Sequence, residues 1–179
     1  VVLGLATGST PLKMYEALVQ MYQRGGLDFA RVVTYNLDEY IGLSADHDQS
    51  YHYFMDANLF GKINIPKENT HVPDGMASDL DGMCADYEEA IREAGGIDVQ
   101  LLGIGGNGHI AFNEPGSTRD SRTRVVDLTS ETIRANSRFF EDESEVPKQA
   151  VTMGIASIME ARELVLIADG AHKAEGIAK

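Results

Sequence analysis

Hydrophobic and polar positions along the chain alternate between short apolar runs and longer stretches with apolar residues at helical spacing. The short runs predict strands at residues 1–6, 31–37, 97–102, 150–153 and 163–168, with shorter strands at 70–72 and 125–128. The stretches between them predict helices at residues 11–24, 50–59, 78–94 and 129–139, with further helices beginning near 155 and after 170. Strands that alternate with helices indicate an α/β fold with a mostly parallel sheet and helices on both faces.

The pattern contains one core, so we expect a single α/β domain over residues 1–179. Val1 begins inside a strand pattern and Lys179 ends inside a helical one, so we expect a chain truncated at both ends. The run at 163–168 is apolar throughout and predicts a buried strand. Thr10, Ser50 and Ser78 stand where helix N-caps are expected, and residues 129–132 fit the start of a helix.

Composition narrows the classes of function. Hydrophobic residues make up 43% of the chain and charged residues 24%, which is typical of soluble proteins, and no run is long enough to span a bilayer. The net charge of -13 argues against partners such as nucleic acid or an anionic membrane, but allows a small anion held by local cations. The single cysteine, Cys84, predicts a buried thiol and a reducing, cytoplasmic location.

A glycine-rich segment, residues 103–115, follows the predicted strand at 97–102 and contains His109 and Glu114. Ligands of open α/β sheets bind beyond the carboxyl ends of the strands. An imidazole beside a carboxylate can transfer protons near neutral pH. Two interpretations remain open from this segment alone: an active-site loop, or a turn with a solvated histidine.

Another loop, Thr7-Gly8-Ser9-Thr10-Pro11, lies between the first strand and the first helix. Backbone amides and hydroxyls at a helix N-terminus can hold a phosphate, although a plain helix cap explains the pattern equally well. The segment lacks the lysine of a nucleotide-binding P-loop. Near the C-terminus, Lys173 lies in a first helical turn, where it opposes the helix dipole unless it points into solvent or binds an anion.

Two adjacent carboxylates, Asp38 and Glu39, follow the second strand. Neighbouring strand residues point to opposite faces, so only one of the two is expected to face a given site, where it could act as a general base. A helix cap or a solvated turn is the alternative. Asp46, His47 and Asp48 have no second cluster at metal-ligand spacing, so we predict no metal site.

Four segments together resemble glucosamine-6-phosphate deaminase, in order along nearly the whole chain. They are Thr7–Pro11, Asn36–Tyr40, Gly108–Pro115 and Ala135–Phe140. The resemblance implies a modified doubly wound, Rossmann-like sheet and a reaction without metal or cofactor. That reaction converts glucosamine 6-phosphate and water to fructose 6-phosphate and ammonia, by aldose–ketose isomerisation with loss of the amine.

The resemblance also implies roles for individual residues. His109 matches the acid–base group that opens the sugar ring, and Asn107 and Glu114 match the residues that orient its imidazole. Asp38 matches the base that moves the C2 proton to C1, with Glu39 facing away. The residues that match the phosphate-binding set are Thr7, Gly8, Ser9, Thr10, Arg138 and Lys173.

Two positions depart from patterns in the family. Many members have aspartate at Asn107; asparagine can accept a hydrogen bond and fix the imidazole tautomer, but it supplies no charge. Some members are activated by an N-acetylated sugar phosphate bound between subunits, and here Arg124 remains while Val126 replaces a lysine. The sequence therefore leaves both that activation and a homo-oligomer open.

Two alternatives to the deaminase remain. One is a hydrolase like 6-phosphogluconolactonase, whose members share the fold but not the Phe112-Asn113-Glu114-Pro115 ending. The other is a regulatory domain that binds a sugar phosphate without turnover, although such a domain needs no base at Asp38.

Overall fold

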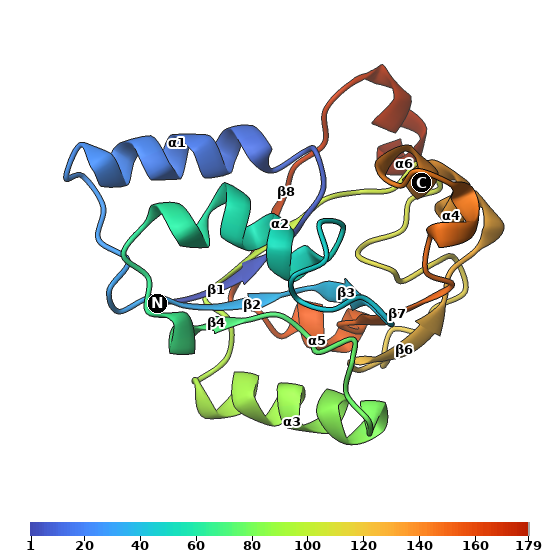
Figure 1. The fold of residues 1–179 in the computed structure, drawn as a ribbon, viewed down its shortest axis with the longest axis horizontal. Coiled ribbons are helices and arrows are strands. Elements are labelled where there is room, and N and C mark those ends of the chain that lie inside the picture. The colour runs from blue at the N-terminus through green and yellow to red at the C-terminus, as the bar shows by residue number, and fades with distance from the viewer. Residues whose placement is uncertain (179) are drawn as a thin grey trace.

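The computed structural model describes residues 1–178 and has a five-stranded parallel sheet at its centre (Figure 1). The strands, in order across the sheet, are β4 (Thr70–His71), β2 (Val33–Asn36), β1 (Val2–Leu5), β5 (Val99–Leu102) and β8 (Glu163–Leu166). The strands run in one direction, so the segments that follow β1, β2, β5 and β8 all leave the sheet at the same edge.

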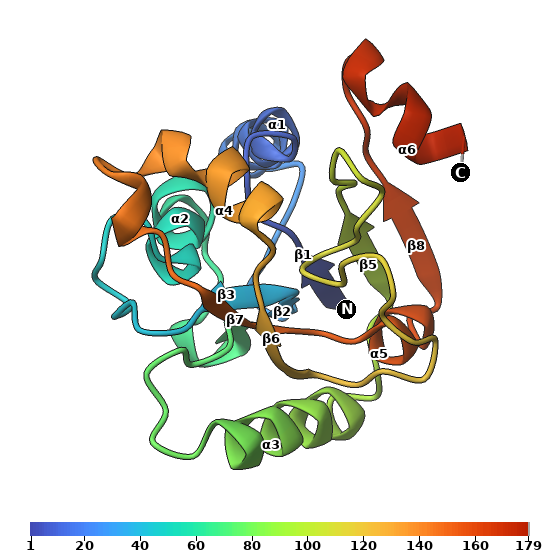
Figure 2. The same ribbon diagram turned by 90° about the vertical axis from the view of Figure 1, so that its right-hand side faces the viewer.

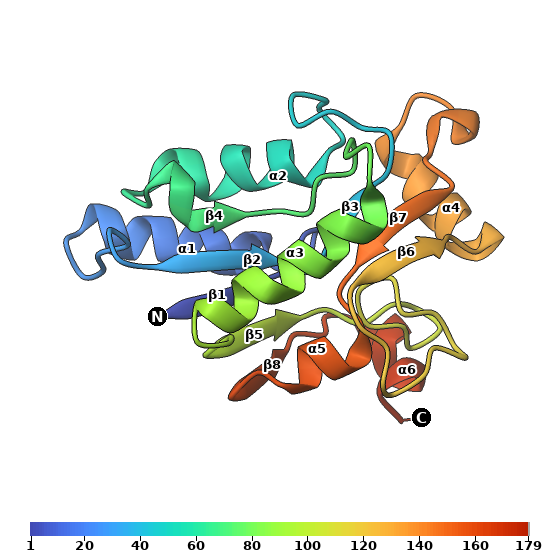
Figure 3. The same ribbon diagram turned by 90° about the horizontal axis from the view of Figure 1, so that it is seen from below.

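Helices cover both faces of this sheet. On one face lie α1 (Leu12–Gln23) and α2 (Tyr51–Asn58), and on the other lie α3 (Leu80–Glu93) and α5 (Ile155–Met159) (Figures 1 and 3). The predicted α/β class, a mostly parallel sheet with helices on both faces, is confirmed. Among residues 1–178, no helix combines the length and hydropathy needed to cross a bilayer.

A second sheet of three antiparallel strands was not predicted. Its strands are β3 (Asp38–Tyr40), β7 (Gln149–Thr152) and β6 (Arg124–Asp127), which lie beyond the end of the parallel strands (Figure 2). Only Leu37 separates β2 from β3, and its carbonyl accepts a hydrogen bond from the amide of Met153 at 2.7 Å. The chain therefore changes sheets within one residue, which the apolar pattern does not reveal.

One predicted helix cap, Ser50, is correct and two, Thr10 and Ser78, are wrong. The hydroxyls of Ser50 and Thr129 accept hydrogen bonds from backbone amides three residues later, at the start of α2 and of α4 (Ser130–Asn136). Helix α3 is capped by Asp79 instead of Ser78, because the Asp79 carboxylate accepts from the Gly82 amide at 2.9 Å. Helix α1 has Pro11 at its N-cap position, with no side-chain cap from Thr10.

The expectation of a buried strand at 163–168 is wrong. All four residues of β8 are exposed, and the apolar side chains of Leu164, Val165 and Leu166 are 40%, 41% and 47% exposed. Among the described residues β8 pairs only with β5, so it lies at the edge of the sheet that these residues form. An apolar sequence identifies a strand here but does not report whether both of its faces are covered.

The buried apolar side chains form two clusters. The main core lies between the parallel sheet and its helices and includes Leu5, Tyr15 and Met55. The second core lies against β3, β6 and β7. It consists of Tyr40, Phe112, Leu128 and Ala150, with Leu43, Tyr51, Val126, Ile133 and Phe140 partly buried around them. Phe112 belongs to the glycine-rich segment, so the second core ties that segment to β3.

Candidate active site

The glycine-rich loop, residues 103–115, folds back on itself directly after β5. The amide of Gly105 donates to the carbonyl of His109 at 2.8 Å, which closes the turn. A Cβ at Gly105 would lie 2.3 Å from Cε1 of His109, so only glycine permits this approach of the imidazole. Ala111 adopts a left-handed backbone with φ 52°, a strained conformation for a residue with a side chain.

His109 and Glu114 face one another across this turn. Nδ1 of His109 lies 3.4 Å from Oε2 of Glu114, and the two side chains are 22% and 13% exposed. Within the described residues the buried Nδ1 atom has no hydrogen bond of good geometry. The carboxylate of Glu114 is therefore placed to orient the imidazole of His109. A small side-chain movement would shorten the distance between them to that of a hydrogen bond.

The Glu114 carboxylate is held by side-chain donors from two directions. Asn107 Nδ2 donates to Oε2 at 2.8 Å, while the hydroxyls of Thr129 and Thr132 donate to Oε1. Partial burial raises the pKa of Glu114, but the hydrogen bonds from Thr132 and Asn107 and the charge of His109 outweigh it, so the pKa is lowered overall. Glu114 is therefore an ionised carboxylate at neutral pH.

Asn107 holds the loop in a different way from the one expected. Its Oδ1 accepts from the backbone amide of His109 at 3.1 Å, while its Nδ2 donates to Glu114. Neither contact involves the imidazole ring, so Asn107 does not fix the ring tautomer directly. It positions the carboxylate that faces the ring.

The threonines at the start of α4 were missed as part of this cluster. The segment Thr129–Thr132 was interpreted only as a helix start, and Thr129 indeed caps α4. Two hydroxyl residues three positions apart can bond both the helix backbone and a carboxylate from elsewhere. The spacing was visible in the sequence, but the partner, Glu114, is brought close only by the fold.

The loop is connected to Asp38 through strand β7. The amide of Phe112 donates to the Thr152 hydroxyl at 3.1 Å, and Asn113 Nδ2 donates to the carbonyl of Met153 at 2.8 Å. Thr152 is also the residue paired with Asp38 in the register of β3 and β7. Directly paired residues of antiparallel strands share a face, so the fold brings the predicted base and the glycine-rich loop to the same face at one strand end.

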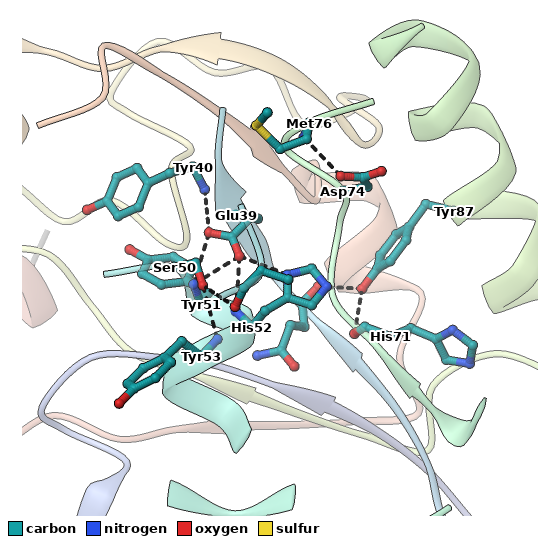
Figure 4. Close-up of polar contacts among 12 residues, drawn as sticks. Glu39, Tyr40, Ser50, Tyr51, His52, Tyr53, His71, Asp74, Met76 and Tyr87 are labelled. Carbon is teal, nitrogen blue, oxygen red and sulfur yellow. Dashed lines mark hydrogen bonds and ion pairs between the residues drawn. The ribbon is translucent and has the colours of Figure 1, made fainter. Parts of the chain in front are cut away.

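Asp38 itself is buried, with 7% of its surface exposed, and accepts no hydrogen bond from any described residue. Burial, with a contribution from the neighbouring charge of Glu39, raises its pKa to about 8. The Glu39 carboxylate binds the N-terminus of α2 through the amides of Tyr51 and His52 (Figure 4). The prediction that the two carboxylates would separate to opposite faces of the strand agrees with this geometry.

The loop after β1 has the properties of an anion site. Among the hydrogen bonds of residues 1–178, none uses a backbone amide or hydroxyl of Thr7, Gly8, Ser9 or Thr10. Gly8 has φ 91°, so this turn requires a glycine. These free donors precede α1, a helix of 12 residues, and a phosphate there would meet both amides and the helix dipole.

Of the two predicted cations, Lys173 lies on a segment that packs against the glycine-rich loop, and Arg138 lies on the surface after α4. Lys173 precedes α6 (Ala174–Ala178), and a Cβ at Gly176 in that helix would lie 3.3 Å from the Gly105 carbonyl oxygen. Arg138 is exposed, with its guanidinium 4.6 Å from the centre of the Phe139 ring. In the described residues neither cation forms an ion pair with an acidic side chain.

Two cavities among the described residues are not lined by any of the predicted site residues. One, of about 540 Å³, lies between α3 and α5, and its Arg122 is already paired with Glu88 and Glu160. The other, of about 180 Å³, has an apolar lining behind the loop at Gly108 and Ile110. Neither offers free donors for an anion. Over residues 1–178 no three side chains of His, Cys, Asp or Glu converge as metal ligands.

Comparison with known families and proteins gives one consistent result. The family described as glucosamine-6-phosphate isomerases/6-phosphogluconolactonase matches residues 1–179. A glucosamine-6-phosphate deaminase of Thermoanaerobacter sp. (strain X514) is 61% identical over 98% of this chain and 70% of its own length. One from Alkaliphilus metalliredigens is 58% identical over 98% of this chain and 73% of its own length.

Solved structures extend the comparison to the fold. A monomeric glucosamine-6-phosphate deaminase superposes with a TM-score of 0.97 at 45% identity, covering 99% of this chain and 73% of that one. A 6-phosphogluconolactonase from Thermotoga maritima superposes with a TM-score of 0.79 at 24% identity, covering 99% of this chain and 74% of that one. The second likeness concerns the fold alone.

Proposed function

Because the chain belongs to the glucosamine-6-phosphate isomerase/6-phosphogluconolactonase family, we propose that it converts glucosamine 6-phosphate and water to fructose 6-phosphate and ammonia. The observation that carries the proposal is the arrangement around Thr152. It joins the His109–Glu114 pair on the loop to the buried carboxylate of Asp38. A binding domain has no use for an unpaired buried carboxylate, whereas proton abstraction next to a carbonyl or imine requires one.

In the proposed reaction the loop from Thr7 to Thr10 binds the phosphate through its free amides and hydroxyls, with Arg138 and Lys173 as the cations. His109 accepts the proton of the C1 hydroxyl and donates one to the ring oxygen, which opens the ring. Glu114, kept ionised by its hydrogen bonds, orients the imidazole and stabilises its protonated form.

Asp38 then removes the proton from C2 of the open-chain sugar and returns it to C1. The intermediate is an enolamine, and transfer of one amine proton to O1 leaves an imine at C2 and a hydroxyl at C1. Water adds to that imine, the C–N bond breaks, and ammonia leaves with fructose 6-phosphate as the other product. Asp38 must be deprotonated to begin this step, so we expect the rate to rise as the pH passes through about 8 and to level off above it.

The test is an assay of ammonia release from glucosamine 6-phosphate, coupled to detection of fructose 6-phosphate. We expect both products in equal amounts. Hydrolysis of 6-phosphogluconolactone without ammonia release would overturn the proposal in favour of the lactonase activity. Saturable binding of the amino sugar phosphate without either product would identify a binding domain.

His109→Gln tests the ring-opening role separately. The variant should lose roughly 10²–10⁴-fold in rate on the cyclic sugar, because one positioned acid–base group is removed. It should retain more of its activity on an analogue that is already open. Equal losses on both substrates would contradict the assignment of His109.

A further inference from the structure

Glu39 is the most completely hydrogen-bonded carboxylate near the candidate site, although the proposed reaction gives it no role. Its side chain is 1% exposed, and it accepts from the backbone amides of Tyr40 at 2.8 Å, Tyr51 at 2.9 Å and His52 at 3.0 Å (Figure 4). Two of these amides form the first turn of α2. Three amide donors, two of them at a helix N-terminus, satisfy both oxygens of this carboxylate.

His52 completes this cluster from the helix side. Its Nδ1 lies 3.0 Å from Oε2 of Glu39, and its side chain is 35% exposed (Figure 4). Glu39 is thus bound both by its own strand, through Tyr40, and by α2. The carboxylate fixes the position of β3 on α2, and Asp38, the preceding residue, is fixed with its side chain on the opposite face.

In the part of the chain that the structure describes, the other ionisable groups that interact electrostatically with Asp38 are phenols. They are Tyr15 from α1, Tyr51 from α2, Tyr87 from α3 and Tyr40 from its own strand. Burial raises the pKa of every one of them, to about 12 for Tyr40, so all four are neutral over the pH range of an assay. Opposite Asp38, β7 presents the hydroxyl of Thr152. Among the described residues, Glu39 is the charged group that raises the pKa of Asp38.

We propose that Glu39 is a positioning residue. It anchors β3 on α2 so that Asp38 faces the sugar, and its own negative charge lies close to the Asp38 carboxylate. This inference rests on the proposed function for the role of Asp38. A like charge close to a carboxylate makes that carboxylate bind its proton more tightly, and a group that binds a proton more tightly is a stronger base. Glu39 would thus strengthen the base without touching the substrate.

Glu39→Gln tests the charge, because it keeps the shape and one oxygen acceptor. The kcat/KM for ammonia release should rise with pH as Asp38 loses its proton, and we call this rise the acidic limb. Its midpoint should move to lower pH by roughly one unit, because Asp38 loses a neighbouring charge. The matched control is Asp48→Asn, which removes a carboxylate that is 73% exposed in the loop before α2. That control should leave the limb where it is.

His52→Leu tests the same cluster if Glu39→Gln folds poorly. It removes one donor to the carboxylate and leaves the three backbone amides in place, so the charge of Glu39 is less compensated. The acidic limb should move the other way, to higher pH, and by less. If the midpoints of the acidic limb for both variants lay within about 0.2 pH unit of the parent's midpoint, the proposal would be overturned.

A measurement without substrate separates this inference from the proposed function. A carboxyl with a raised pKa stabilises the fold below the unfolded pKa, and that stability is lost as pH rises toward the folded value. Asp38→Asn has no carboxyl at this position and does not lose this stability. The difference between its Tm and that of the parent should therefore grow from pH 4 to pH 9. When Asp38→Asn is added to Glu39→Gln instead of to the parent, the increase in Tm that it causes at pH 9 should be smaller. An equal gain in both backgrounds would overturn the role of Glu39 even if no ammonia were released.

Discussion

Two carboxylates near the candidate site, Asp38 on β3 and Glu114 on the glycine-rich loop, have opposite surroundings. Glu114 accepts hydrogen bonds from Asn107, Thr129 and Thr132 and faces an imidazole. Asp38 is 7% exposed, accepts no hydrogen bond from the described residues and lies next to another carboxylate. The pKa of Glu114 is lowered although its partial burial raises it, and that of Asp38 is raised by burial to about 8.

The difference indicates a division of labour that residue type alone does not show. Donors aimed at a carboxylate stabilise its charge, so Glu114 is suited to orient a cation and unsuited to accept a proton. A carboxylate without donors keeps a high proton affinity and is suited to acid–base transfer near neutral pH. Each of the following variants makes one of the two carboxylates resemble the other or removes it.

Asp38→Asn should have the largest effect. It removes the proposed base while keeping the size of the side chain, so ammonia release should fall by roughly 10²–10⁴-fold. Exchange of the C2 proton with deuterated solvent should fall by the same factor, because it reports the same step. Binding of the substrate, measured by calorimetry, should change little.

Two results would contradict the assignment of Asp38. One is C2 exchange at the parent rate, which would place the base elsewhere. The other is loss of binding together with loss of activity in a folded variant, which would make Asp38 part of the binding surface.

Glu114→Gln should have an intermediate effect. The imidazole of His109 would keep a neighbour of similar shape but lose the negative charge that stabilises its protonated form. We expect a loss of roughly tenfold in kcat, smaller than the roughly 10²–10⁴-fold loss for a group that transfers the proton itself. The matched control is Glu131→Gln, an exposed carboxylate in the first turn of α4, which should have parent activity.

Thr132→Val should have a smaller effect on activity and a clear one on the pKa of Glu114. The variant keeps the side-chain shape but removes a hydroxyl that donates to Oε1. The pKa of Glu114 should rise, and the fold should lose about 1 kcal/mol, the usual cost of one hydrogen bond. Chemical denaturation measures the free energy of unfolding, and a carboxyl titration by NMR measures the pKa. An unchanged pKa would mean that the hydroxyl does not stabilise the charge.

The sequence predicted the parts of this comparison that depend on local spacing. Asn107, His109 and Glu114 lie within eight positions on one glycine-rich turn, and strand alternation separated Asp38 from Glu39. The pairing of Asp38 with Thr152 was beyond prediction, because it joins positions far apart in the chain and depends on a second sheet. The contacts of Thr132 were missed for the same reason: the helix-capping pattern is local, whereas its carboxylate partner comes from another segment.

Asn107→Asp should have the smallest effect and sharpens the comparison most directly. It replaces the amide that donates to Glu114 at 2.8 Å by a second carboxylate, so Glu114 acquires the kind of neighbour that Asp38 has in Glu39. The pKa of Glu114 should rise, because a donor is lost and a like charge is gained. The activity should remain within about threefold, since the proton-transferring groups His109 and Asp38 are untouched.

The stability of this variant should depend on pH with a definite sign. In the parent, the lowered pKa of Glu114 stabilises the fold above the unfolded value, and this stability is lost as pH falls through the folded value. Asn107→Asp should therefore be less stable than the parent at pH 7, by about 1 kcal/mol, and the difference should shrink toward pH 3. A constant difference over that range would show that the loop responds to the shape of residue 107, and that the charge on Glu114 does not depend on the Asn107 amide.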